Sequence, residues 1–135
     1  MKAQNRGSAA ASYALSILRI VTGFLFICHG LQKVFGMLGG HRMPVNAMLT
    51  TLPGIGGLLE LIGGALIVMG LFTRPTAFIL CGEMAVAYFK VHFPQGATPL
   101  QNRGELAVLD CFVFFYLMFA GGGAISLDRL LRGKN

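Results

Sequence analysis

Ionisable side chains inside hydrophobic stretches are the feature of this sequence most able to do chemistry. Four of the five acidic residues lie inside or at the edge of apolar runs, together with basic residues and histidines. The full set is Arg19, His29, Lys33, Glu60, Glu83, Lys90, His92, Glu105 and Asp110. Such groups can exchange protons, hold a polar ligand or form ion pairs, but each is costly in hydrocarbon unless it is paired or hydrated. We therefore expect them to meet inside the protein, away from lipid.

The elements that must position these side chains are hydrophobic helices. The chain is 55% hydrophobic and 12% charged, with a mean hydropathy of +0.69, whereas an average soluble domain is about 25% charged. A hydrocarbon core needs roughly 20 helical residues to cross it. Runs near that length cover about residues 13–37, 53–72, 75–93 and 104–122. The sequence predicts an all-α polytopic membrane protein, with residues 1–135 forming a single domain, a bundle of four transmembrane helices.

The distribution of positive charge predicts the orientation of this bundle. Four spans place both termini on one side, and cytoplasmic loops carry an excess of Lys and Arg. The side of the termini carries six cations and the opposite loops carry two. These are Lys2, Arg6, Arg74, Arg129, Arg132 and Lys134 against Arg42 and Arg103. Both termini are therefore predicted to be cytoplasmic.

Two short segments lie outside the four runs. Residues 127–131 are apolar with flanking arginines and are expected to lie against the inner leaflet. Residues Pro44–Leu52 are short and weakly apolar. They are expected at the membrane interface, either as a short helix or as a cap over the bundle.

Helical spacing predicts which way the acidic and basic groups point. Glycines three or four residues either side of Glu60 share its face, namely Gly56, Gly57, Gly63 and Gly64. Small residues let helices approach closely in a membrane, so Glu60 should point into the bundle. His29 and Lys33 are four residues apart, and Lys90 follows Glu83 by seven, so each pair shares a face. These charges converge on the outer half of the bundle.

Four members of the set fit this convergence less well. Arg19 lies nearer the cytoplasm than the others. His92 follows Glu83 by nine residues, which places it on the opposite face of an ideal helix, so it lies past the helix end or faces the surface. Glu105 and Asp110 are five residues apart and diverge.

Three hypotheses account for the polar constellation. It is an internal ion-pair network that fixes helix register, a pocket for a small redox-active or lipophilic ligand such as a quinone, or a proton or ion path. A path needs polar groups reaching both sides of the membrane, and the inner half offers only Arg19. This argues against the path.

Other function classes receive less support. No zinc-type spacing of histidine and glutamate occurs, so no metal site is predicted. Haem fits less well than quinone, because a paired axial haem site needs two histidines that face each other, and helical spacing does not predict that His29 and His92 do so. Cys28, Cys81 and Cys111 are odd in number, form no C-x-x-C pair and are expected to pack as small apolar residues. No polar face exists to carry a nucleic-acid-binding surface.

The order and spacing of these residues resemble the DoxX family of small bacterial membrane proteins, over about residues 17–128. The resemblance rests on Leu18-Arg19-Ile20, Gly23, Phe26, His29-Gly30, Lys33 and Phe35-Gly36, on Glu60, Gly63-Gly64, Gly70 and Thr73-Arg74, on Met84, Ala87-Tyr88 and His92, and on Asn102-Arg103-Gly104-Glu105, Leu106-Ala107 and Ser126-Leu127-Asp128. The chain departs from the family pattern at Arg103, where glycine is usual, and Asp110 is also unusual. Either change is a candidate for an altered partner or ligand.

The resemblance implies a multi-pass protein of the bacterial inner membrane, associated with thiol and sulfur redox protection or with quinone-linked oxidoreductases. The leading expectation is a membrane subunit of a redox system with a polar intramembrane pocket, in which Glu60 and Glu83 exchange protons and His29 orients a ligand oxygen. The alternative is a non-enzymatic scaffold or assembly factor whose charges only fix helix packing. Whether the chain is an enzyme stays open, and no catalytic residue is assigned. Expected partners are the lipid bilayer, membrane or soluble oxidoreductases, and a second copy of the chain.

Overall fold

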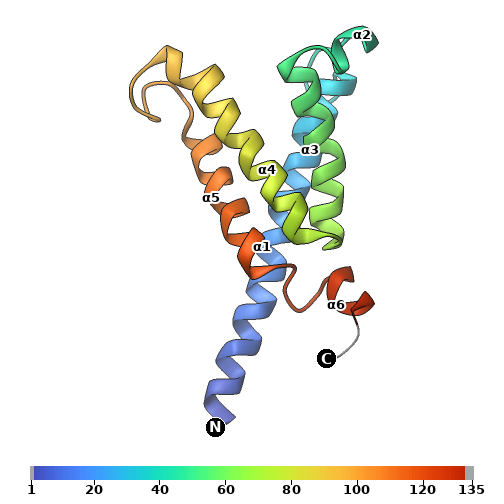
Figure 1. Cartoon of the computed structure of the whole chain (residues 1–135), viewed down its shortest axis with the longest axis vertical. Coiled ribbons are helices and arrows are strands. Elements are labelled where there is room, and N and C mark those ends of the chain that lie inside the picture. Colours follow the sequence, from blue (N-terminus) through green and yellow to red (C-terminus); the bar gives the residue numbers. More distant parts are fainter. Residues whose placement is uncertain (1, 133–135) are drawn as a thin grey trace.

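The computed structural model describes the backbone of residues 2–132 and the side chains of residues 7–132. Its main elements are helices (Figure 1). They are α1 (Lys2–Phe35), α2 (Val45–Met48), α3 (Leu52–Met69), α4 (Thr73–Ala87), α5 (Glu105–Ala120) and α6 (Leu127–Leu131), and α4 continues through a π-helical turn at Tyr88–His92 and a 3₁₀ turn at Phe93–Gln95. The prediction of an all-α chain with long apolar helices is confirmed.

The predicted spans correspond to α1, α3, α4 with its extension, and α5. Among the described residues, three helical stretches are long and apolar enough to cross a membrane: Gly7–Phe35, Leu52–Met69 and Thr73–Gln95. Helix α5 has 16 residues, or about 24 Å at 1.5 Å per residue, which is shorter than a hydrocarbon core of about 30 Å. Helix α1 starts well before the predicted residue 13, because its alanine-rich first turns favour helix.

Both short segments form helices. The segment 44–52 contains the four-residue helix α2 and leads directly into α3. Thr51 starts α3, since its hydroxyl accepts a hydrogen bond from the Gly54 N–H at 3.2 Å. The segment 127–131 is α6, capped in the same way by Ser126 through the Arg129 N–H.

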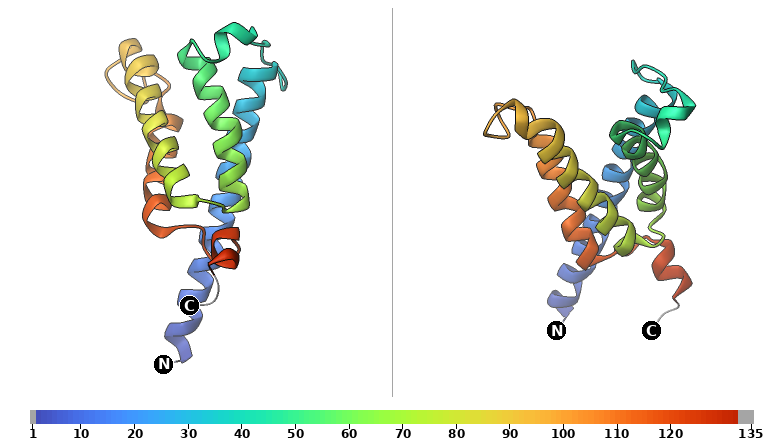
Figure 2. Two further views of the ribbon diagram at one scale, coloured as in Figure 1. Left: turned by 45° about the vertical axis from the view of Figure 1, so that its right-hand side comes forward. Right: turned by 45° about the horizontal axis from the view of Figure 1, so that its top comes forward.

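The four long helices pack as two pairs. Helix α1 packs along α3, and α4 packs along α5, whereas contacts between the pairs are sparser. The pairs meet near the α6 end and diverge toward the end that carries α2, as Figures 1 and 2 show. Glycines bring α1 and α3 together: a Cβ on Gly64 would lie 2.8 Å from the Gly23 carbonyl oxygen, and one on Gly30 would lie 2.6 Å from the Leu61 nitrogen.

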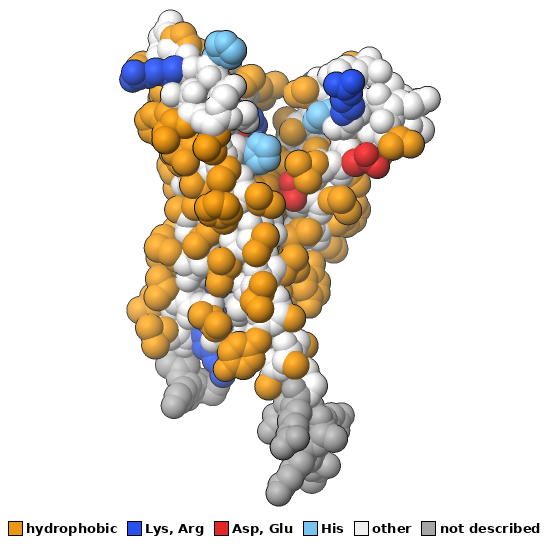
Figure 3. Space-filling model, turned by 180° about the vertical axis from the view of Figure 1, so that it is seen from behind, with side chains coloured by type: hydrophobic (Ala, Val, Ile, Leu, Met, Phe, Trp, Pro, Cys, Tyr) orange, Lys and Arg blue, Asp and Glu red, His pale blue; other side chains and the backbone are white. Residues whose placement is uncertain are grey.

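An apolar core joins the two pairs. Phe26 of α1 meets Phe114 of α5 edge to face, with ring centroids 4.7 Å apart. Ile67, Leu80 and Leu117 are also buried in this cluster. Large apolar side chains cover the outer surface as well, as Figure 3 shows on one face. An apolar exterior of this kind suits lipid rather than water. The ionisable side chains predicted to meet inside the protein therefore belong beyond Phe26, where the two helix pairs separate.

Candidate functional site

An ion pair between α1 and α3 lies where the two helix pairs begin to separate. Lys33 Nζ is 2.7 Å from Glu60 Oε1. The Glu60 side chain is 5% exposed and that of Lys33 is 38% exposed. Gly57 makes room for the lysine, because a Cβ there would lie 2.9 Å from Lys33 Cβ. The glycine-rich face of α3 therefore both packs against α1 and holds the pair.

Two cavities flank this ion pair. One, of about 260 Å³, is lined by groups from α1, α3, the π-helical turn and α5, among them His29, Glu60, His92 and Asp110. The other, of about 360 Å³, lies between α3 and α4 and is lined by Glu83, Lys90 and apolar side chains. Lys33, Met84 and Ala87 line both. Figure 3 shows a hollow between the two helix pairs in which histidine and acidic side chains gather.

Two carboxylates at these cavities keep unsatisfied oxygen atoms. Glu60 Oε2 and Glu83 Oε2 are buried and have no hydrogen-bond partner within the described part of the chain. Glu60 uses only its other oxygen, for Lys33. Leaving a buried polar atom without a partner is unfavourable, so such atoms mark positions where a water, a proton or a polar ligand is expected.

A π-helical turn determines where His92 lies. The turn at Tyr88–His92 is wider than an α-helical turn, so it changes the phase of the residues that follow. His92 therefore lines the same cavity as His29, whereas an ideal helix would direct it away from Glu83. Its Nδ1 lies 3.1 Å from the Asn102 carbonyl oxygen. Turns of this type occur frequently at functional sites.

The loop between α4 and α5 contributes two residues absent from the predicted set. Asn102 is buried, donates a hydrogen bond to the Gly96 carbonyl and accepts one from the Gly104 N–H. It thereby shapes the loop that holds His92. Arg103 has a positive φ of 57° and, with Asp110, lines the cavity that contains His29 and His92. The Asn-Arg-Gly sequence was the available signal, since such triplets favour turns.

The structure brings together seven of the nine predicted residues and leaves two outside. His29, Lys33, Glu60, Glu83, His92 and Asp110 line the cavities, and Lys90 lines one of them while remaining exposed. Glu105 is exposed at the start of α5 and lines neither cavity. Arg19 lies at the opposite end of the bundle and is 1% exposed, and its guanidinium donates hydrogen bonds to backbone carbonyls there.

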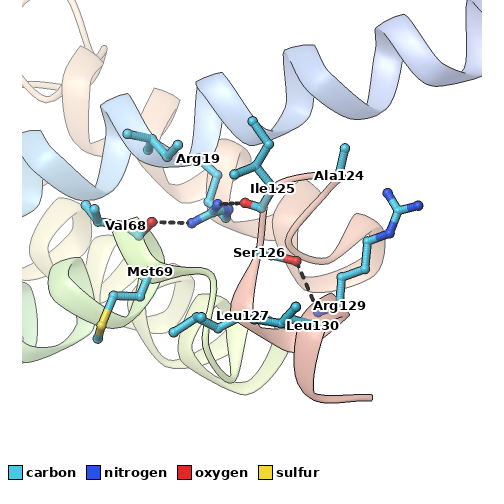
Figure 4. Close-up of a pocket in the computed structure, with 10 residues that line it drawn as sticks. Arg19, Val68, Met69, Ala124, Ile125, Ser126, Leu127, Arg129 and Leu130 are labelled. Carbon is cyan, nitrogen blue, oxygen red and sulfur yellow. Dashed lines mark hydrogen bonds between the residues drawn. The ribbon is translucent and has the colours of Figure 1, made fainter. Parts of the chain in front are cut away.

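Arg19 ties α1 to two other segments. Its Nε donates to the Gly122 carbonyl at 2.9 Å and Nη1 to the Val68 carbonyl at 2.7 Å. The carbonyl of Ile125 accepts a further hydrogen bond from the same group (Figure 4). The Ile67 carbonyl accepts another. A guanidinium can saturate several carbonyls in this way, which explains why the cation is held so deeply.

Comparison with known proteins assigns the family. The sequence profile of the DoxX family matches residues 14–93, more than half of the chain. The chain belongs to the DoxX family. No solved structure matches this DoxX protein significantly.

Several relatives align with this DoxX protein over most of its length. An uncharacterized protein of Haemophilus influenzae is 42% identical, covering 87% of this chain and 90% of the relative. Inner membrane protein YqjF of Escherichia coli is 33% identical, covering 87% and 92%. A Bacillus subtilis protein named "Putative oxidoreductase CatD" is 28% identical, covering 87% of each. Together with its long apolar helices, these relatives make this DoxX protein a multi-pass protein of the inner membrane.

Proposed function

We propose that this protein is a membrane subunit of a redox system. The two cavities that flank the Lys33–Glu60 ion pair, together called the cleft, would hold a quinone-class ligand. One observation carries the proposal: the buried carboxylate of Glu60, which lines one cavity, binds Lys33 through one oxygen and has no partner among the described residues for the other. An ion pair that only fixed helix packing would be expected to satisfy both carboxylate oxygens. Here Glu60 Oε2 and Glu83 Oε2 have no hydrogen-bond partner in the described part of the chain, so each can accept a hydrogen bond from another group.

The proposal includes four membrane crossings with both termini in the cytoplasm. Helix α5 runs beside α4 and crosses with it, and the local bilayer thins to match its shorter length. The excess of cations on the side of the termini supports the orientation. The cleft then opens in the outer half of the membrane, the end at which α2 and the α4–α5 loop lie.

The lining of the cleft suits a flat, lipophilic molecule with oxygen atoms at its edge. Met84 and Ala87 provide apolar contacts in both cavities. Lys33 and His29 can donate hydrogen bonds to a ligand oxygen, and Glu60 and Glu83 can accept or release protons. A bound quinone would supply the exchange of two electrons and two protons. The residues of this chain would orient it and hold those protons.

The relative named as an oxidoreductase supports a redox setting, although it is only 28% identical. The same residues also support a second function, that of a scaffold or assembly factor without a ligand. The observation in its favour is that Lys33 and Glu60 already form a direct ion pair. The partner in a redox system would be a membrane or soluble oxidoreductase, or a second copy of the chain.

Binding of a short-chain ubiquinone analogue separates the two functions. The protein is purified in lipid nanodiscs and titrated calorimetrically. Glu60→Gln and His29→Ala should each weaken binding at least about tenfold, the loss expected when a hydrogen bond to a charged group is removed. Glu105→Gln and His41→Ala are matched controls, because both side chains are exposed and line neither cavity.

The outcome for the scaffold function is different. Binding that is unchanged in both Glu60→Gln and His29→Ala would reject the ligand site. A wild type whose thermal unfolding midpoint the analogue does not raise, with lower midpoints in both variants, would also reject it and support the scaffold. Analogue-dependent stabilisation of the wild type that is lost in both variants would support the ligand site.

A further inference from the structure

The end of the bundle opposite the cleft carries a basic hollow. It has a volume of about 490 Å³ and lies where the segment after α5 runs past the start of α4. Arg74, Arg129 and Arg132 line it, and Asp128 is the one carboxylate among the described lining residues. The guanidinium of Arg74 lies over the end of α5, since a Cβ on Gly121 would be 3.4 Å from Arg74 Nε. Three cations thus converge from α4 and α6.

The carboxylate of Asp128 is engaged elsewhere. Its two oxygens accept hydrogen bonds from the backbone N–H groups of Phe72 and Thr73, each at 2.8 Å. Within the described side chains, no carboxylate comes within ion-pair distance of the three guanidinium groups. The hollow therefore retains a positive charge that an anion from outside the chain can neutralise.

An apolar groove adjoins the basic hollow. It has a volume of about 500 Å³, and its lining includes Ile20, Val68, Met69, Leu127 and Leu130. Ser126 and Arg129 line both spaces, so the two are contiguous. Figure 4 shows the groove between α1, the end of α3 and α6, with Arg19 bonded to carbonyls at its base and Arg129 extending from α6.

We propose that these two spaces together bind one anionic phospholipid, with its phosphate among Arg74, Arg129 and Arg132 and an acyl chain in the groove. A charged hollow joined to an apolar groove at the ends of membrane-crossing helices matches the chemistry of an amphiphile at the interface. Arginine recognises phosphate through paired hydrogen bonds. Basic pockets between membrane helices on the cytoplasmic side are a recognised kind of lipid headgroup site. The site is independent of the proposed redox function.

Charge distinguishes this occupant from a neutral lipid. Phosphatidylglycerol carries a net negative charge, whereas phosphatidylethanolamine carries an ammonium that the arginines would repel. Each basic residue near an anionic lipid headgroup is expected to strengthen binding about fivefold. The arginines should therefore discriminate between the two headgroups when the acyl chains are identical.

Native mass spectrometry of the detergent-solubilised full-length protein tests the proposal. The wild type is mixed with phosphatidylglycerol or phosphatidylethanolamine of identical acyl chains, and retained lipid is counted. We expect a preference for phosphatidylglycerol that falls about fivefold in Arg129→Gln and further in Arg129→Gln/Arg132→Gln. Both side chains are exposed, so these variants should fold. Arg42→Gln, an exposed arginine at the opposite end, is the matched control.

A second pair of measurements tests the groove. Leu130 is 76% exposed, and Leu130→Glu places a carboxylate at the groove without disturbing the core. It should reduce retention of phosphatidylglycerol, and glycerophosphoglycerol, which lacks acyl chains, should compete poorly. Equal retention of the two lipids, or an equal loss in Arg42→Gln, would overturn the site. Effective competition by glycerophosphoglycerol would overturn the part assigned to the groove and indicate a free phosphate ester as the ligand.

Discussion

Lys33 Nζ lies 2.7 Å from Glu60 Oε1, between one cavity that contains two histidines and another that contains Glu83. The pair joins the two most closely packed helices, α1 and α3, at the level where the second helix pair moves away. Its position means that the lysine can contact both cavities while the glutamate remains buried. The pair thus links the packing of the bundle to any chemistry that occurs in the cleft.

Breaking this ion pair should destabilise the protein. Lys33→Met leaves the Glu60 carboxylate buried without its cation, a change that costs about 3–5 kcal/mol in a fully buried pair. We expect a smaller loss, about 2 kcal/mol, because Lys33 is 38% exposed. Thermal or denaturant unfolding in detergent measures the loss, with Lys90→Met as the control at an exposed lysine. The double variant Lys33→Met/Glu60→Gln should recover part of the stability. A double variant that is less stable than Lys33→Met would contradict the assignment.

Two glycines allow a matched test of helix packing. Gly64→Ala would place a Cβ 2.8 Å from the Gly23 carbonyl oxygen, so α1 and α3 must separate. Overpacking of this kind costs about 1–3 kcal/mol. A Cβ on Gly82 would meet no atom of the described residues within 4 Å, and alanine is favoured over glycine in a helix by roughly 0.5–1 kcal/mol. The unfolding midpoint should fall in Gly64→Ala and stay or rise in Gly82→Ala. Equal destabilisation by the two variants would show that the α1–α3 contact does not depend on Gly64.

The junction of α4 and α6 should make stability depend on acid pH. Burial alone raises the pKa of Asp128, but hydrogen bonds from Thr73 and Phe72, with the charge of Arg132, more than compensate and lower it below its usual value. A lowered pKa in the folded state stabilises the fold above the unfolded pKa of about 3.9, and this contribution is lost as pH falls through the folded pKa. Asp128→Asn should reduce stability by about 1 kcal/mol at pH 7, the scale of a helix cap.

Unfolding midpoints at pH 7 and pH 3 measure this contribution. The difference between wild type and Asp128→Asn should shrink at pH 3, because the carboxyl of the unfolded chain is then largely protonated, and it should shrink further as pH falls through the lowered folded pKa. The comparison cancels the other acidic groups, which both proteins share. A difference of the same size at both pH values would mean that the Asp128 charge does not hold α4 to α6.

Much of the fold and part of the candidate site follow from local patterns. Hydrophobic runs of membrane length predict the long helices, and spacing along a single helix predicts that Glu60 shares a face with its neighbouring glycines. These inferences need only the helical repeat. The meeting of Lys33 with Glu60 required the further condition that α1 packs against α3, which the glycine faces of both helices favour.

Features that depend on tertiary structure could not be predicted from the sequence. The π-helical turn that brings His92 to the cavity has no local signature comparable to a proline or a cap. Arg19 bonds to carbonyls more than 45 positions away along the chain, which no spacing rule predicts. Division of the bundle into two diverging pairs depends on how side chains fill the space between them. Spacing along the chain also does not predict that the Sγ atoms of Cys81 and Cys111 lie 3.7 Å apart between α4 and α5.

Photoaffinity labelling with an azido-quinone in lipid nanodiscs, followed by peptide mapping, tests the central claim most directly. The account predicts that label is incorporated around His29–Lys33 of α1 and Glu83–Ala87 of α4, and that both signals decrease in Glu60→Gln but not in Glu105→Gln. Label confined to the exposed helix surfaces or to the groove beside Arg19, and unaffected by Glu60→Gln, would contradict a quinone site at the Lys33–Glu60 pair.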